Sequence, residues 1–211
     1  MRPGRSLELK VRVQSLLNAA KWIHAQHGDE ALALVLRRCS VPVRERYANS
    51  LAIEWHPQEE LIEFITVAET TLGKSDGQLC VQFGAAGARA NLGGIVQRTV
   101  FYFANREYMF RRIASLWRQF NDEGELKALE YNEAAATLEL TGIPQPNAYF
   151  CALLTGWSYE VALALGANRP QTRHVSCLAA RGTRCLWEIA WKGFSFDENE
   201  LTKIKKTWGE P

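Results

Sequence analysis

Four residues in the C-terminal part of the sequence have side chains that bind metal ions: Cys151, His174, Cys177 and Cys185. Their spacing is C-x22-H-x2-C-x7-C. Thiolate and imidazole are ligands that zinc prefers, and structural zinc sites close with four protein ligands. Such a site leaves no coordination position for water or substrate. The set therefore predicts a structural zinc site rather than a catalytic one.

The predicted elements determine whether these residues can meet. Cys151 falls in the first turn of a predicted helix, where the positive helix end favours a thiolate. His174 and Cys177 lie on one strand of a predicted hairpin, and Cys185 lies on the other. Residues three apart in a regular strand point to opposite faces, so His174 and Cys177 can share a metal only at a bulge or a strand end. The alternative is that the cysteines are buried and inert beside an unrelated histidine.

A second motif accompanies the cysteines. The pattern C-x7-C-x-[FW]-E-[IV] is present as Cys177, Cys185, Trp187, Glu188 and Ile189. With it, the stretch from Tyr149 to Trp191 resembles the vinyl-4-reductase domain family. That family includes the sensor domains of phenol-responsive transcription activators. It is related to the small subunits of the TRAPP vesicle-tethering complex and to the haem-NO-binding domain.

The resemblance bears directly on the metal. In the phenol sensors a zinc is held by residues spaced C-x22-E-x2-C-x7-C. This sequence has the same intervals, with His174 where those proteins have Glu. The resemblance thus implies a Cys3His zinc set, in which the histidine remains a competent ligand.

The related domains bury a ligand between their helices and their sheet, so the resemblance also implies a pocket. The aromatic residues that could line it are Phe101, Tyr102, Tyr108 and Trp117. The favoured alternative is that these residues are ordinary core, since aromatic side chains dominate the cores of most proteins. The His and Trp with which the phenol sensors hold the phenol hydroxyl have no match here. Phenol specificity is therefore not implied.

The resemblance implies a non-enzymatic sensor or ligand-binding module that holds a small hydrophobic molecule and signals through a partner protein. Relatives commonly pair through their N-terminal helices, so a homodimer is expected. The alternative is a scaffold or adaptor that acts through protein contacts without a ligand. An enzyme acting on a tetrapyrrole vinyl group ranks last, because no nicotinamide or flavin motif is present.

Composition is that of an ordinary globular protein, with 47% hydrophobic and 23% charged residues in 211. A net charge of +2 gives no general attraction to nucleic acid. The segment Ala148–Ala167 is apolar but contains Glu160, which favours a buried helix over a membrane span. No secretory signal is visible, so we expect a cytoplasmic protein in which the five cysteines do not form stable disulfides.

The pattern of elements predicts an α+β fold, with a mainly helical part at 1–124 and an α+β part at 125–211 in one compact domain. Predicted helices cover 17–27, 29–38, 58–72, 79–92, 105–120, 147–165 and 197–208, and predicted strands cover 9–16, 126–131, 136–141, 172–178 and 184–191. The Ala- and Gly-rich stretch at 79–92 predicts a helix that a neighbour approaches closely.

Some residues are predicted to have no site role. His24 and His27 are expected on the surface, and Cys39 and Cys80 in the core. Pro42 is expected to break the helical pattern. His56 and Pro57 are expected to form a turn.

Overall fold

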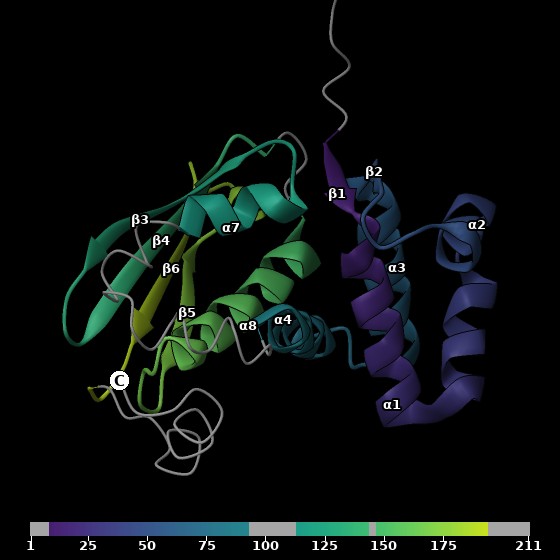
Figure 1. Ribbon diagram of the computed structural model, residues 1–211, viewed down its shortest axis with the longest axis horizontal. Helices are drawn as coiled ribbons and strands as arrows, with labels where there is room; N and C mark the ends of the chain where they lie inside the picture. Colours follow the sequence, from purple (N-terminus) through teal and green to yellow (C-terminus); the bar gives the residue numbers. More distant parts are fainter. Residues whose placement is uncertain (1–8, 93–112, 144–146, 194–211) are drawn as a thin grey trace, which may run out of the picture.

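The computed structural model describes residues 9–92, 113–143 and 147–193, and its architecture is α+β, as the sequence predicts. The N-terminal elements are β1 (Lys10–Arg12), α1 (Val13–Arg38), α2 (Val41–Asn49), β2 (Trp55–Pro57), α3 (Gln58–Leu72) and α4 (Gln78–Leu92). The C-terminal elements are α7 (Ile113–Phe120), β3 (Glu125–Tyr131), β4 (Ala135–Thr141), α8 (Ala148–Ala164), β5 (Gln171–Ser176), the short 3-10 helix η1 (Leu178–Ala180) and β6 (Cys185–Ala190) (Figure 1). The predicted helix at 197–208 lies outside the described residues.

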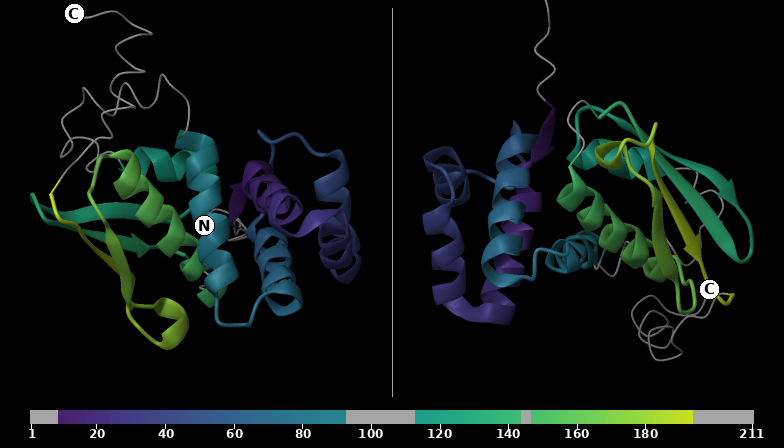
Figure 2. Two further views of the ribbon diagram at one scale, coloured as in Figure 1. Left: turned by 90° about the horizontal axis from the view of Figure 1, so that it is seen from below. Right: turned by 180° about the vertical axis from the view of Figure 1, so that it is seen from behind.

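The elements lie in successive layers (Figures 1 and 2). One side of the molecule is an antiparallel sheet with strand order β3-β4-β6-β5. Helix α8 packs on β5 and β6, and α7 packs on β3. Helix α4 packs on α8, and α1 and α3 pack on α4 in turn, so α8 and α4 connect the sheet to the N-terminal helices.

The N-terminal elements differ from the sequence prediction in the predicted strand 9–16 and at two prolines. Only Lys10–Arg12 of that segment is a strand, because α1 already begins at Val13. Pro42 lies in the first turn of α2 rather than at a break, because a proline there removes no helical hydrogen bond. His56 and Pro57 belong to β2 rather than to a turn, and His56 pairs with Val11 of β1. Gly28, with φ 83°, divides α1 into the two helices that the sequence predicts.

Helices α4 and α8 approach each other closely because each has a glycine at the crossing. A Cβ atom on Gly84 would lie 1.7 Å from the backbone oxygen of Leu153. A Cβ atom on Gly156 would lie 1.8 Å from the backbone oxygen of Val81. The close approach predicted for the Ala- and Gly-rich helix is therefore confirmed, and its partner is α8.

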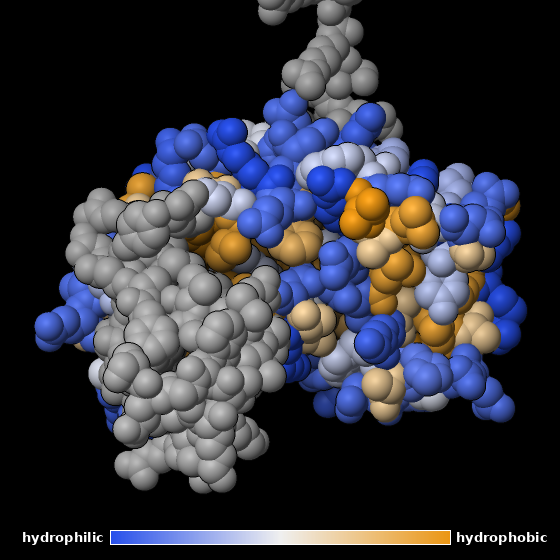
Figure 3. Space-filling model, in the orientation of Figure 1, coloured by the Kyte–Doolittle hydropathy of each residue, from blue (hydrophilic) through white to orange (hydrophobic). Residues whose placement is uncertain are grey.

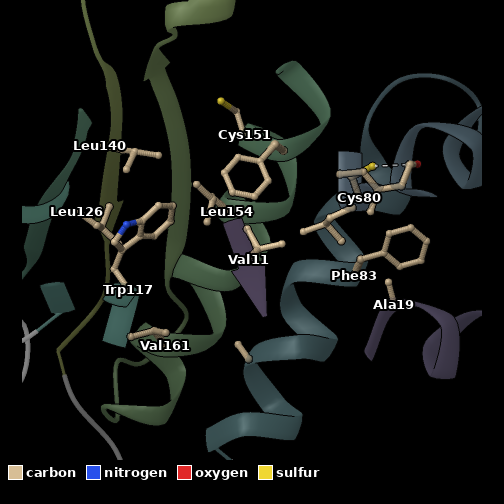
Figure 4. Close-up of a cluster of buried hydrophobic side chains, with 14 of the residues drawn as sticks. Val11, Ala19, Cys80, Phe83, Trp117, Leu126, Leu140, Cys151, Leu154 and Val161 are labelled. Carbon is tan, nitrogen blue, oxygen red and sulfur yellow. Dashed lines mark hydrogen bonds between the residues drawn. The ribbon is translucent and has the colours of Figure 1, made fainter. Parts of the chain in front are cut away.

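The apolar core runs from the sheet through α8 to the N-terminal helices. Figure 4 shows Leu154 of α8 between Trp117, Leu126 and Leu140 on the sheet side and Cys80 and Phe83 of α4 on the other, with Val161 farther along α8. Helix α8 is thus a buried core helix, as the sequence predicts. Of the helices in the described part, none has the length and apolar character needed to cross a membrane.

Candidate metal centre and interior cavity

The structure brings the four predicted metal ligands together. One ligand atom from each of Cys151, His174, Cys177 and Cys185 lies within 4.8 Å of the others. Cys151 and Cys185 are buried, while His174 and Cys177 are partly exposed. The cluster lies where the start of α8 meets the end of the β5–β6 hairpin.

Local structure explains why α8 presents Cys151 at this point. The Asn147 side chain accepts hydrogen bonds from the backbone amides of Tyr149 and Phe150, at 2.9 and 3.1 Å. An asparagine at this position satisfies amides that have no partner within the helix, and so fixes where the helix begins. Cys151 therefore lies in the first turn of α8, as the sequence predicts.

An irregularity in the hairpin allows His174 and Cys177 to face the same point, although residues three apart in a regular strand face opposite sides of the sheet. The register of β5 with β6 shifts between His174 and Ser176, which marks an irregularity of the bulge type. Strand β5 then ends, and Cys177 comes directly before η1. The bulge and the strand end together let two residues three apart face the same point.

The separations of the sulfur atoms match those of a tetrahedral zinc site. Cys151 Sγ lies 3.6 Å from Cys185 Sγ and 3.8 Å from Cys177 Sγ. Zn–S bonds of about 2.3 Å in a tetrahedron place the sulfurs about 3.8 Å apart. A disulfide would need about 2.05 Å, and all three cysteines are free.

The electrostatics of the thiols favour a cation. The hydrogen bond with Cys185, together with burial, raises the pKa of Cys151. The same hydrogen bond lowers the pKa of Cys185. The Leu178 amide also donates to Cys185 Sγ at 3.4 Å, which further lowers the pKa of Cys185 and favours its thiolate. Further thiolates in this space would repel it unless a positive charge lay between them.

His174 has the environment of an oriented ligand. Its ring stacks on Trp187, with centroids 4.5 Å apart and an angle of 11° between planes. Its Nε2 atom is buried and has no hydrogen-bond partner among the described residues, and the imidazole lowers the pKa of the neighbouring Cys185 thiol. Trp187 is itself held by a 2.9 Å hydrogen bond from Nε1 to Thr155 Oγ1 on α8, a contact that the sequence analysis missed.

A cavity of about 60 Å³ lies on the other side of α8, among α1, α4 and α7. Trp117 lines it, whereas the other predicted pocket residues, Phe101, Tyr102 and Tyr108, lie outside the described residues. Its polar lining includes Asn18 of α1 and Asn91 of α4. The sequence analysis did not select these asparagines, and no spacing pattern could have connected residues 73 apart.

The remaining titratable candidates take no part in either region. His24 and His27 are exposed, as predicted, and His24 pairs with Asp29. Cys39 and Cys80 are buried core thiols, also as predicted. His56 is buried at β2.

No family model matches the chain, and no curated protein matches it. Solved structures do. An H-NOX protein from S. oneidensis is 12% identical, with a TM-score of 0.65, over 87% of this chain and 97% of that one. An H-NOX protein from K. algicida is 8% identical, with a TM-score of 0.64, over 86% of this chain and 96% of that one.

The chain has the H-NOX fold. The relation to the haem-NO-binding domain that the sequence suggests is therefore confirmed at the level of fold. The vinyl-4-reductase assignment itself stays a prediction.

The H-NOX structures are described with haem and with Fe(II) or Fe(II)NO ligation. In this chain all four histidines lie within the described residues, and none of them lines the cavity. Among the described lining residues there is also no Cys, Met or Tyr, the other side chains that ligate haem iron. Pockets for large ligands measure roughly 300 Å³ or more. The described cavity, at about 60 Å³, is smaller than that, and its described lining offers no side chain that ligates haem iron.

Proposed function

We propose that this protein is a non-enzymatic sensor or ligand-binding module in which a structural zinc joins the hairpin to α8. Cys151, His174, Cys177 and Cys185 would hold the metal, and a small hydrophobic molecule would lie on the other side of α8. One observation carries the metal proposal: sulfur atoms from three separate elements lie at the separations of a zinc tetrahedron.

The metal would act on structure alone. With four protein ligands it has no open position, so it would neither activate water nor bind substrate. Its contribution is to tie the β5–β6 hairpin to the first turn of α8. Helix α8 would then transmit the state of the cavity to the hairpin, and a signal would pass to a partner protein by contact.

Metal content tests the proposal. Protein purified without chelator should contain about one zinc per chain by elemental analysis. Cys185→Ser should abolish the zinc and lower the midpoint of thermal unfolding. The matched control is Cys39→Ser, which replaces a buried cysteine outside the cluster and should keep the zinc. Metal-free wild-type protein that is well folded would contradict the proposal.

The expected homodimer stays part of this proposal. Three large apolar side chains in the N-terminal half, Val41, Leu51 and Ile53, are 53%, 64% and 71% exposed. Figure 3 shows apolar residues gathered on the surface over the N-terminal helices. We propose that two copies pair through this face in the cytoplasm. Analytical ultracentrifugation should find a dimer that Ile53→Glu dissociates and that Leu129→Glu, an exposed change on β3, leaves intact.

The same exposed side chains favour the second candidate, a scaffold or adaptor that acts through protein contacts without a ligand. A monomeric wild type, with one stable partner in a pull-down that Ile53→Glu abolishes, would support this candidate over the dimeric sensor.

A further inference from the structure

We infer that the cavity among α1, α4, α7 and α8 takes a small, electrically neutral molecule whose apolar body carries one group that both donates and accepts hydrogen bonds. This inference rests on the proposal that the chain holds a small molecule, and it adds the chemistry of that molecule. Charge, hydrogen bonding, wall composition and size each restrict the occupant.

The residues that line the cavity restrict the charge of its occupant. Among the described residues that line the cavity, none is Asp, Glu, Lys, Arg or His. An ion placed there would lose its hydration without gaining a counter-charge, and that loss is costly. The occupant is therefore neutral.

Amide groups determine the polar part of the occupant. Gln14 Nε2 donates to Asn91 Oδ1 at 3.0 Å, and Asn18 Nδ2 donates to the same oxygen at 3.5 Å. Because Asn91 accepts twice at Oδ1, its Nδ2 is the atom that can donate to a ligand. Because Asn18 donates from Nδ2, its Oδ1 can accept. A donor beside an acceptor is complementary to a carboxamide or a hydroxyl group.

Apart from Ser15 and Asn121, the other residues of the described lining suit an apolar body. Phe83, Phe150 and Trp157 contribute aromatic rings from α4 and α8. The Trp117 indole N–H donates to the backbone oxygen of Glu123 at 3.0 Å. With its polar atom engaged there, Trp117 presents carbon to the cavity.

Size excludes large ligands. A volume of about 60 Å³ corresponds to roughly four water-sized spheres. Propionamide, with its short alkyl chain and one amide, is therefore a suitable probe.

Gly87 provides a way to close the cavity without disturbing the fold. It lines the cavity from α4, and a Cβ atom there would have only Asn18 Nδ2 as a neighbour, at 3.9 Å. A larger side chain at this position would therefore extend into the cavity. Ala90, exposed on the same helix, offers the matched control.

The experiment titrates the full chain with propionamide, propionate and n-propylammonium, and separately with xenon. The indole N–H signals of Trp117 and Trp157 report binding by NMR. We expect propionamide to bind in the millimolar range, and the two charged molecules to bind at least tenfold more weakly. Gly87→Leu should abolish propionamide binding, whereas Ala90→Leu should leave it unchanged.

Asn91 variants test the orientation. Asn91→Leu should weaken propionamide binding at least tenfold. Asn91→Asp places a negative charge in the cavity and should reverse the preference toward n-propylammonium. That reversal is a gain of binding, which a misfolded variant would not show.

Three results would overturn the inference. If propionate or n-propylammonium binds wild type as well as propionamide, the neutral-ligand inference is wrong, although the chain still holds small molecules. If only xenon binds, the cavity is a plain apolar one and the amides have no role. If nothing binds, the ligand half of the proposed function fails as well, while metal content still decides the zinc half.

Discussion

Helix α8 contacts two regions that are built in opposite ways. Local features fix the positions of the side chains in the metal cluster. The cap at Asn147 fixes where α8 begins, the strand irregularity after His174 turns β5, and the Leu178 amide donates a hydrogen bond to Cys185. The cavity is lined in part by Gly87, where an added Cβ atom would meet only Asn18 Nδ2, at 3.9 Å. The first region is suited to hold a shape and the second to accept an occupant.

Because of this difference, we expect amino-acid substitutions to have different effects in the metal cluster and in the cavity. The cluster should depend on the identity of each ligand, since a tetrahedral site has no spare member. The cavity should depend on volume and polarity, and should tolerate exchange among apolar residues. The α4–α8 crossing supports both regions, so it is the place where one change should affect both.

The largest effect is expected at that crossing. Gly84→Ala places a Cβ atom 1.7 Å from the Leu153 backbone oxygen, so the two helices must separate. We expect a loss of about 4 kcal/mol or more in the free energy of unfolding, measured by urea denaturation. The matched control is Gly87→Ala on the same helix, where the nearest atom is 3.9 Å away. That control should stabilise by up to about 1 kcal/mol.

If Gly84→Ala leaves both the zinc content and propionamide binding unchanged, the crossing does not support both regions. The comparison would then reduce to two independent sites on one helix.

The next effect concerns His174, the proposed ligand that stands where the phenol sensors have Glu. His174→Ala should weaken zinc affinity by more than about 100-fold, because even residues that only orient ligands change affinity by 10- to 100-fold. His174→Glu should retain zinc, since carboxylate oxygen is also a ligand. The control is Arg173→Ala, an exposed neighbour paired with Glu188. Competition with a chromophoric chelator measures all three, and equal affinity in His174→Ala and wild type would remove the histidine from the site.

The sequence was informative where chemistry is local. The helix at 58–72 is found with the predicted bounds, because its apolar residues follow a helical period and Gly73 ends it. The residue types and spacing of Cys151, His174, Cys177 and Cys185 are sufficient to predict the metal cluster. The required bulge followed from strand geometry alone.

The sequence was uninformative where distant residues act together. The hydrogen bond from Trp187 to Thr155 and the one from Gln14 to Asn91 join different elements, and no local pattern indicates them. Pro42 and Pro57 were misread because proline is tolerated in a first helical turn and in a short strand at the edge of a sheet. The sequence around each proline does not distinguish these positions from a helix break or a turn.

A smaller effect is expected from the cap that positions the cluster. Asn147→Ala removes the acceptor for the amides of Tyr149 and Phe150 and should cost about 1 kcal/mol of unfolding free energy. Asn147→Ser should restore most of it, since serine also caps helices. Zinc affinity should fall with the alanine variant and recover with the serine variant. An unchanged affinity would show that the ligands, rather than the cap, place Cys151.

The smallest effect lies outside both regions, at His56. Its ring is buried, and Nδ1 donates at 3.0 Å to Glu60, whose same oxygen accepts from Arg46 at 2.9 Å. The ring is fully buried, and burial disfavours the charged imidazolium, although Glu60 and the Arg12 backbone both favour it. Burial lowers the pKa of His56 from 6.5, although Glu60 opposes the shift. The unfolded chain therefore binds this proton more readily than the folded one.

Stability from His56 should be fully present above pH 6.5 and decline as the pH falls through its lowered pKa. Urea denaturation between pH 8 and about 5 measures this decline, and His56→Gln should flatten it. His24→Asn, which changes an exposed histidine, should not. Because wild type and His56→Gln share every other titratable group, the difference between their two curves isolates His56. A decline that survives in His56→Gln would show that a group other than His56 causes the pH dependence, and the linkage argued from the burial of this ring would be wrong.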